Sequence, residues 1–111
     1  MSSVIVLVAA MLAIFSSMAA AAGFDCNPSS TNGLCPKAVI CGVSVLWELD
    51  GKVENTYHHL LSQRTGASAE LLKSDQRAWL ELRNACACDA SCLEREYQRR
   101  ATELERIDAK P

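Results

Sequence analysis

The sequence lacks the patterns on which the common enzyme mechanisms and nucleic-acid binding depend. It has no glycine-rich phosphate loop, no recognisable pair of catalytic carboxylates, and no serine or cysteine placed beside a histidine base. Its two histidines, His58 and His59, are adjacent in a helical pattern, where neighbouring side chains point about 100° apart. Lys and Arg number 11 against 13 Asp and Glu, so the formal net charge is -2. We therefore expect neither catalysis nor nucleic-acid binding.

Charge is absent from the N-terminal part of the chain. Residues 4–22 carry no charged side chain, and the first basic residue of the sequence is Lys37. The stretch is too alanine-rich at its end for a membrane span of about 20 residues, and the Ala-x-Ala pattern at 20–22 suits signal peptidase. We interpret residues 1–23 as a secretory signal peptide without the usual basic start, and 24–111 as one exported domain. The predicted location is secreted or periplasmic, with no membrane anchor after cleavage.

Six cysteines in a small exported domain predict disulfide bonds. The core of so small a domain is marginal, and secreted domains of this size add covalent links. The even count allows full pairing, although it does not fix which cysteines pair. A metal site built from Cys86, Cys88, Cys92 and the histidines is the alternative. Because the spacing differs from paired Cys-x-x-Cys zinc modules and export is oxidising, we expect no metal and no other cofactor.

Helical spacing of apolar residues runs through most of the exported domain. After the turn-rich residues 24–36 it predicts a short helix over 37–41 and a second helix from Val43 to about Leu61. Residues 62–68 interrupt the pattern, and Ser68 is a candidate N-cap for the helix that follows.

Two further helical patterns fill the C-terminal part. Their predicted buried stripes are Leu72, Asp75, Trp79, Leu82 and Cys86, and then Leu93, Tyr97, Ala101, Leu104 and Ile107. Asp89, three residues before Cys92, is a candidate N-cap for the second helix. Because the connection is short, the two should form an antiparallel hairpin. The predicted fold class is all-α: a small disulfide-stapled domain of about four helices with an antiparallel helix hairpin at its C-terminus.

The residues around the tryptophan resemble a known family. Residues 76–86 read Gln-Arg-Ala-Trp-Leu-Glu-Leu-Arg-Asn-Ala-Cys, and the chain also has an early Phe24-Asp25-Cys26, then Cys41, Leu49-Asp50 with Tyr57, and finally Cys92-Leu93. This pattern is similar to that of the LprI-like N-terminal domain of lysozyme inhibitors, a small secreted helical domain. The resemblance covers nearly all of the chain after residue 23 and implies the same fold. The family's motif residues here are Asp50, Gln76, Arg77, Trp79, Arg83, Asn84, Tyr97 and Arg100.

The same resemblance implies two disulfides, Cys26 with Cys41 and Cys86 with Cys92. Cys35 and Cys88 are then left over, and pairing them with each other is the most economical arrangement. That bond would tie the N-terminal loop to the helix hairpin. A competing arrangement joins Cys35 to Cys41 and exchanges other partners.

We interpret the motif residues as mainly structural. Trp79 and Tyr97 occupy core positions of facing helices, where aromatic side chains commonly pack. Arg83 and Arg100 follow them by about one turn and can reach carboxylates such as Asp50 across a helix boundary. We therefore expect structural salt bridges.

The resemblance also implies the function. It predicts an exported, non-catalytic lysozyme inhibitor that occludes the glycosidase cleft, with lysozyme as its protein partner. Such an inhibitor needs donors for the two cleft carboxylates, and two loops offer them: Gln63, Arg64 and Thr65 in one, and Lys37, near Asn32, in the other. The alternative is an envelope module that binds another partner without inhibiting lysozyme. A redox-active or metal-responsive thiol domain is a third hypothesis, which a count of free thiols tests.

Overall fold

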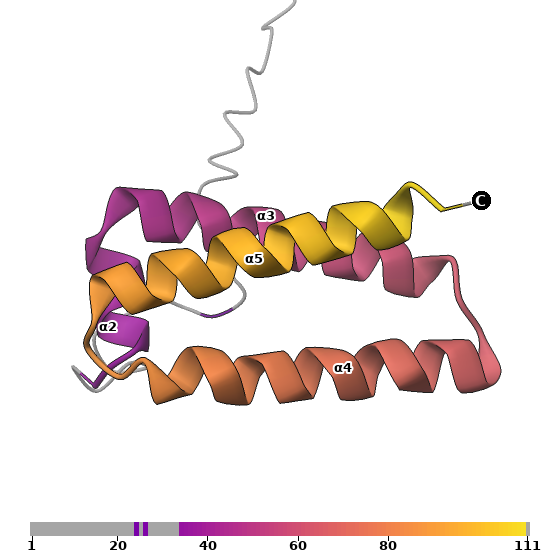
Figure 1. Cartoon of the computed structure of the whole chain (residues 1–111), viewed down its shortest axis with the longest axis horizontal. Coiled ribbons are helices and arrows are strands. Elements are labelled where there is room, and N and C mark those ends of the chain that lie inside the picture. Colours follow the sequence, from indigo (N-terminus) through magenta and orange to yellow (C-terminus); the bar gives the residue numbers. More distant parts are fainter. Residues whose placement is uncertain (1–23, 25, 27–33, 111) are drawn as a thin grey trace, which may run out of the picture.

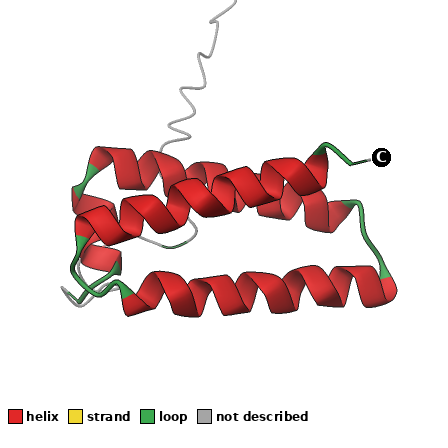
Figure 2. Cartoon of the chain, viewed as in Figure 1, coloured by secondary structure: helices red, strands yellow, loops and turns green. Residues whose placement is uncertain are grey.

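The protein is all-α, as its sequence predicts. The structure, a computed structural model, describes residues 24, 26 and 34–110, and this part contains helices and loops but no strand (Figures 1 and 2). The signal peptide predicted at 1–23 lies outside the described residues, as does Asn32. None of the described helices is both long enough and apolar enough to cross a membrane.

The first two described helices form where the apolar spacing predicts them. Helix α2 (Lys37–Gly42) and helix α3 (Ser44–Ser62) are separated only by Val43, whose backbone is extended. Both helices bury one apolar face, and the fully or nearly fully buried side chains on these faces are Ile40, Leu46, Val53 and Leu60. The predicted bounds are thus correct to within one residue.

The other two helices, α4 (Gly66–Ala85) and α5 (Ala90–Asp108), form the predicted antiparallel hairpin (Figure 1). Asp89 is the N-cap of α5, and its side chain accepts a hydrogen bond from the Cys92 amide at 3.1 Å. The predicted N-cap of α4 is wrong, because the helix begins two residues before Ser68. Gly66 enters it with φ at +57°, a left-handed conformation that glycine adopts without steric cost.

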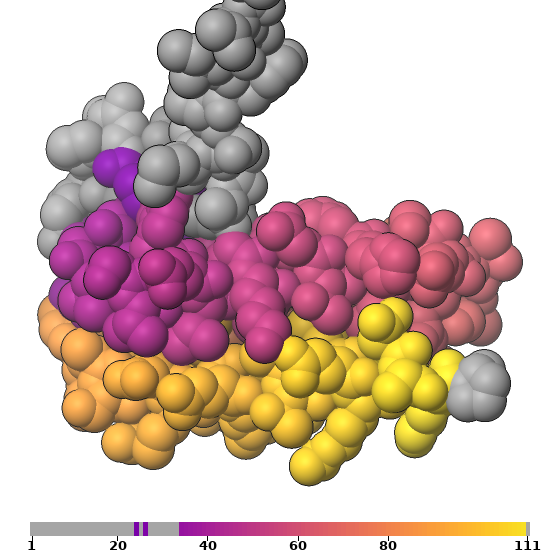
Figure 3. All heavy atoms as spheres, turned by 90° about the horizontal axis from the view of Figure 1, so that it is seen from above, coloured from indigo at the N-terminus to yellow at the C-terminus, as the bar shows by residue number. Residues whose placement is uncertain are grey.

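Helices α3 and α5 run in the same direction and lie side by side, as Figures 1 and 3 both show. Exposed ion pairs link them, Lys52 Nζ to Glu105 Oε1 at 2.7 Å and His59 Nε2 to Asp108 Oδ1 at 3.6 Å. Helix α4 returns antiparallel to this pair (Figure 1). The described part of the chain is therefore a bundle of three long helices with the short α2 at one end.

The predicted stripe of α5 is buried except at Ile107, which is partly buried, whereas that of α4 needs a correction. Leu72, Trp79 and Cys86 are buried as predicted, but Asp75 lies on the surface and Leu82 is 52% exposed. The positions that are buried instead are Gln76 and Arg83. Both polar side chains find partners on neighbouring helices, so that the helix turns a polar face inward at little cost in unsatisfied hydrogen bonds.

All six cysteines are paired, in the bonds Cys26–Cys41, Cys35–Cys88 and Cys86–Cys92. The structure therefore has the more economical of the two arrangements. The Cys35–Cys88 bond joins the segment before α2 to the connection between α4 and α5. All three bonds lie at the α2 end of the bundle, and the connection between α3 and α4 at the opposite end contains none (Figure 1).

Candidate functional site

A groove with a volume of about 460 Å³ lies between α3 and α4. Phe24 and the first residue of α2 contribute to one part of its wall, and α3 and α4 supply the rest. Its lining residues are Phe24, Lys37, Asp50, Val53, Glu54, Tyr57, Lys73, Gln76, Arg77, Trp79, Leu80 and Arg83. Five of these belong to the motif that suggested the family, so the motif and the groove coincide in space.

A buried polar group beside the groove joins three helices. The Tyr97 hydroxyl of α5 donates to Asp50 Oδ1 of α3 at 2.6 Å, and Arg83 Nη1 of α4 donates to the same hydroxyl at 3.3 Å. Arg83 Nη1 also lies 3.9 Å from Asp50 Oδ1, so the predicted pairing across helices is present. Burial, followed by the charge of Asp50, raises the pKa of Tyr97 far above its usual range. Tyr97 is therefore a neutral donor to a buried carboxylate.

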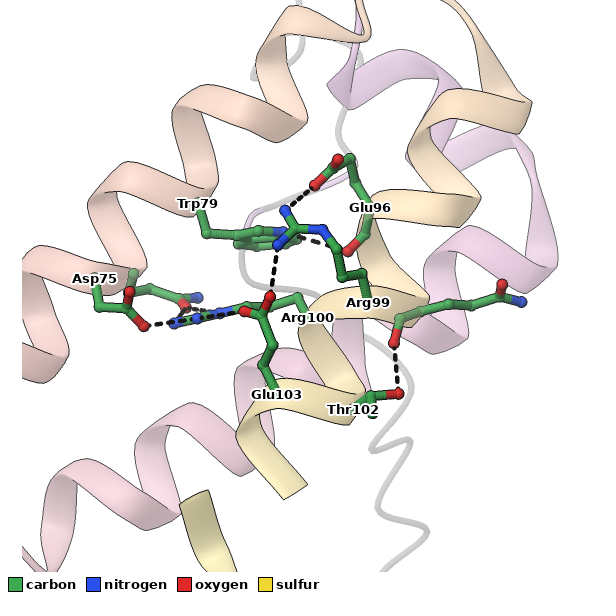
Figure 4. A network of polar contacts seen from close by, with 9 residues as sticks. Asp75, Trp79, Glu96, Arg99, Arg100, Thr102 and Glu103 are labelled. Carbon is green, nitrogen blue, oxygen red and sulfur yellow. Dashed lines mark hydrogen bonds and ion pairs between the residues drawn. The ribbon is translucent and has the colours of Figure 1, made fainter. Parts of the chain in front are cut away.

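Arg100 organises a second polar group, which Figure 4 shows in close-up. Its Nη1 pairs with Asp75 Oδ2 at 2.7 Å and with Glu103 Oε2 at 3.2 Å, while Nε and Nη2 donate to Gln76 Oε1 at 3.0 and 2.8 Å. Arg100 thus pairs with α4 and with its own helix rather than with Asp50. All three nitrogens of this buried guanidinium donate to an oxygen, which explains how it can be 2% exposed.

The motif aromatics pack against each other. The rings of Trp79 and Tyr97 meet edge to face with centroids 5.2 Å apart, and Trp79 Nε1 donates to the Glu96 carbonyl oxygen at 3.3 Å. Trp79 is 4% exposed and Tyr97 is fully buried. The geometry supports the interpretation of these rings as packing residues, because neither offers a face to a partner.

Phe24 covers the buried arginine at the α2 end of the groove. Its ring centroid lies 5.7 Å from the guanidinium carbon of Arg83 and 5.5 Å from Lys37 Nζ. Cations at these distances are attracted to the negative face of a phenyl ring. Phe24 therefore forms a wall of the groove and helps to exclude water from Arg83.

Two motif residues differ from the rest because they are exposed. Arg77 lies at the groove, and Asn84 receives hydrogen bonds from Arg83 Nε and Nη2 at 3.2 and 3.0 Å. Arg77 makes no hydrogen bond or ion pair with any residue in the described part of the chain. The motif thus divides into buried residues that hold the helices together, the exposed Asn84 that accepts hydrogen bonds from Arg83, and Arg77, a cation beside the groove with no partner in the described part.

The residues predicted to touch a partner do not form one surface. Gln63 and Thr65 are exposed in the connection between α3 and α4, and Arg64, half-buried beside them, donates to Ser68 Oγ at 3.3 Å. Lys37 lies on the groove at the opposite end of the bundle (Figure 1). Two separate surfaces therefore carry the predicted contacts.

Sequence reasoning did not select Lys73, Leu80 and Glu54 as site residues. The first two flank Arg77 at helical spacing, four residues before it and three after it. That spacing places all three on one side of α4 and could have indicated a second functional face. Glu54 carries no such signal, because only the packing of α3 beside α4 brings it to the groove.

The described residues offer no arrangement of at least three His, Cys, Asp or Glu side chains suited to a metal ion. Among its described residues, the groove lining contains no serine, cysteine or histidine. The described lining does offer carboxylates, cations and apolar groups, which are the groups that binding pockets use.

These features define a small all-α domain stapled by disulfides around buried polar groups. The family described as lysozyme inhibitor LprI matches residues 26–104, and the chain belongs to that family. No curated protein and no solved structure gives a significant match.

Proposed function

We propose that the protein is an exported, non-catalytic inhibitor of lysozyme. The observation that carries this proposal is the family match, which spans all four described helices up to the last turn of α5. Three disulfides support export, because such bonds persist in the periplasm or outside the cell.

The connection between α3 and α4 is our proposed contact with lysozyme. It joins two helices of 19 and 20 residues at one extremity of the bundle, a position from which a loop could reach into a cleft. Arg64 lies there, and it lines a hollow together with Lys110. Two cations and the exposed amide of Gln63 would offer donors to the two carboxylates with which lysozymes hydrolyse their glycan.

The test is lysis of peptidoglycan by a panel of lysozymes, with and without the purified oxidised protein. We expect at least one lysozyme to be slowed at micromolar concentration, and the reduced and alkylated protein to lose this effect. An oxidised protein that neither binds nor slows any of them would refute the proposal.

Charge reversal then identifies the surface. Arg64→Glu should weaken inhibition by about tenfold or more, since it places a carboxylate against the cleft acids. Arg95→Glu is the matched control, because Arg95 is exposed on α5 and the change in net charge is the same. Equal weakening by both variants would reveal a general charge effect and exclude the connection as the contact.

A further inference from the structure

The groove between α3 and α4 is a different surface from the α3–α4 connection, which is the proposed contact with lysozyme. A groove can receive a protruding segment of a partner, but it cannot itself enter a cleft. Its walls combine apolar and charged groups. Val53 is buried in its floor, and the side chains of Tyr57 and Leu80 are only partly buried. An occupant could therefore remove further apolar surface of these two residues from water.

The charges around this floor are unequal. Asp50 and Arg83 lie near each other in the buried polar group. Among the remaining charged groups of the described lining, three are cationic, Lys37, Lys73 and Arg77, and one is anionic, Glu54. Glu54 Oε1 is hydrogen-bonded to His58 and Lys73 Nζ to Glu70 at 3.1 Å, whereas Arg77 has no partner in the described part. On a chain of net charge -2, this is a local excess of positive charge.

The groove is elongated along the helices. Its α4 side extends from Lys73 to Arg83, which corresponds to about 15 Å at the helical rise per residue. An extended chain covers that length with about five residues. A volume of about 460 Å³ is also within the range that binding pockets use for their ligands.

We propose that this groove binds a short extended segment of a protein partner in which carboxylates alternate with apolar side chains. The apolar side chains would contact Tyr57 and Leu80, and the carboxylates would pair with Arg77, Lys73 and Lys37. Arg77 has the leading role, since its guanidinium is exposed and can hold a carboxylate through two parallel hydrogen bonds. The proposal does not depend on lysozyme inhibition.

The probe is a fluorescein-labelled hexapeptide of alternating aspartate and phenylalanine, with binding to the oxidised protein followed by fluorescence anisotropy. We expect a dissociation constant in the micromolar range. A hexapeptide with lysine in place of aspartate is the matched control, and it should bind at least about tenfold more weakly. Failure of the acidic peptide to bind, or equal binding of both peptides, would overturn the proposal.

Two double variants assign the binding to the groove. Lys73→Glu with Arg77→Glu should weaken the acidic peptide by about tenfold or more. Arg95→Glu with Arg106→Glu makes the same change in net charge on exposed residues of α5, and should alter binding by less than about twofold. Equal losses would mean unspecific attraction and refute the groove as the site. Circular dichroism of both variants checks that they fold.

Oleate, an anion with an apolar chain, tests whether the groove binds a fatty acid in place of a peptide. If oleate binds and the acidic peptide does not, the occupant is not the proposed segment. Lysozyme inhibition by the Lys73 and Arg77 variant should remain unchanged, since the proposed lysozyme contact is Arg64. Either proposal can thus fail without the other.

Discussion

Replacing Cys35 and Cys88 together by alanine should lower the free energy of unfolding more than removing either of the other disulfides. The Cys35–Cys88 bond spans 53 residues, whereas Cys26–Cys41 spans 15 and Cys86–Cys92 spans 6. In the chain-entropy model, closing these loops stabilises the folded state by about 4, about 3 and about 2 kcal/mol respectively.

No loop is shortened by the other bonds, so the three values can be compared directly. Cys88 lies within the loop that Cys86–Cys92 closes, and Cys35 lies within the loop that Cys26–Cys41 closes. For each bonded pair, a route that passes through another disulfide is longer than the direct route along the chain between the two cysteines. Packing works against the predicted order, because Cys86 is buried and Cys88 is exposed. Alanine at the buried position should cost up to about 1 kcal/mol more, which still leaves the 53-residue bond first.

Urea unfolding followed by tryptophan fluorescence provides the assay, since Trp79 packs against Tyr97 and reports separation of α4 from α5. With a slope of about 1 kcal/mol per molar urea, the midpoint of the Cys35 and Cys88 variant should lie about 1 M below the midpoints of the other two double variants. A midpoint for the Cys35 and Cys88 variant above that for the Cys86 and Cys92 variant would refute the reasoning. The comparison holds even if one variant is unfolded without urea, because its midpoint is then zero.

Three further predictions concern single side chains. Because the pKa of Tyr97 is raised in the folded protein, the contribution of this hydroxyl to stability is complete below pH about 10. Above that pH it is lost by up to about 1.4 kcal/mol per pH unit. Urea unfolding at pH 10 and 11 should show this loss in the wild type but not in Tyr97→Phe, and an equal loss in both proteins would contradict the prediction. Arg83→Met should cost about 3 kcal/mol because it leaves Asp50 buried without its cation, whereas Arg77→Met at an exposed position should stay within about 0.5 kcal/mol. Asp89→Ala should lower stability by about 1 kcal/mol through loss of the α5 N-cap, which thermal unfolding beside the wild type would measure.

The helices could be predicted because their apolar spacing is regular over several turns. Leu93, Tyr97, Ala101 and Leu104 are all buried on α5, as the spacing requires. The α3 pattern likewise predicts its helix to within one residue at each end. An apolar stripe of this kind becomes buried in the folded protein, because its residues need no particular partner beyond an apolar surface.

The inner face of α4 could not be predicted in the same way. Helical spacing alone allows Asp75 and Leu82 to lie on the same face as Leu72 and Trp79. Leucine is also buried far more often than arginine, so Leu82 is the expected choice over Arg83. Arg83 is buried because Asp50 and Tyr97, from two other helices, receive its charge and hydrogen bonds. Such a choice depends on tertiary partners, which the sequence of one helix does not contain.

The family motif determines the frame of the groove but not all of the cations that line it. Asp50 and Arg83 tie α3 to α4 through buried contacts, and thereby set the distance between the two helices that frame the groove. Apart from Arg77 and the buried Arg83, however, the cations of the described lining are Lys37 and Lys73, which lie outside the motif and have no role in the buried contacts. A chain can therefore exchange these two cations without losing the bundle. We therefore propose that the motif residues other than Arg77 specify the scaffold, and that Lys37, Lys73 and the exposed residues of the α3–α4 connection select the partner.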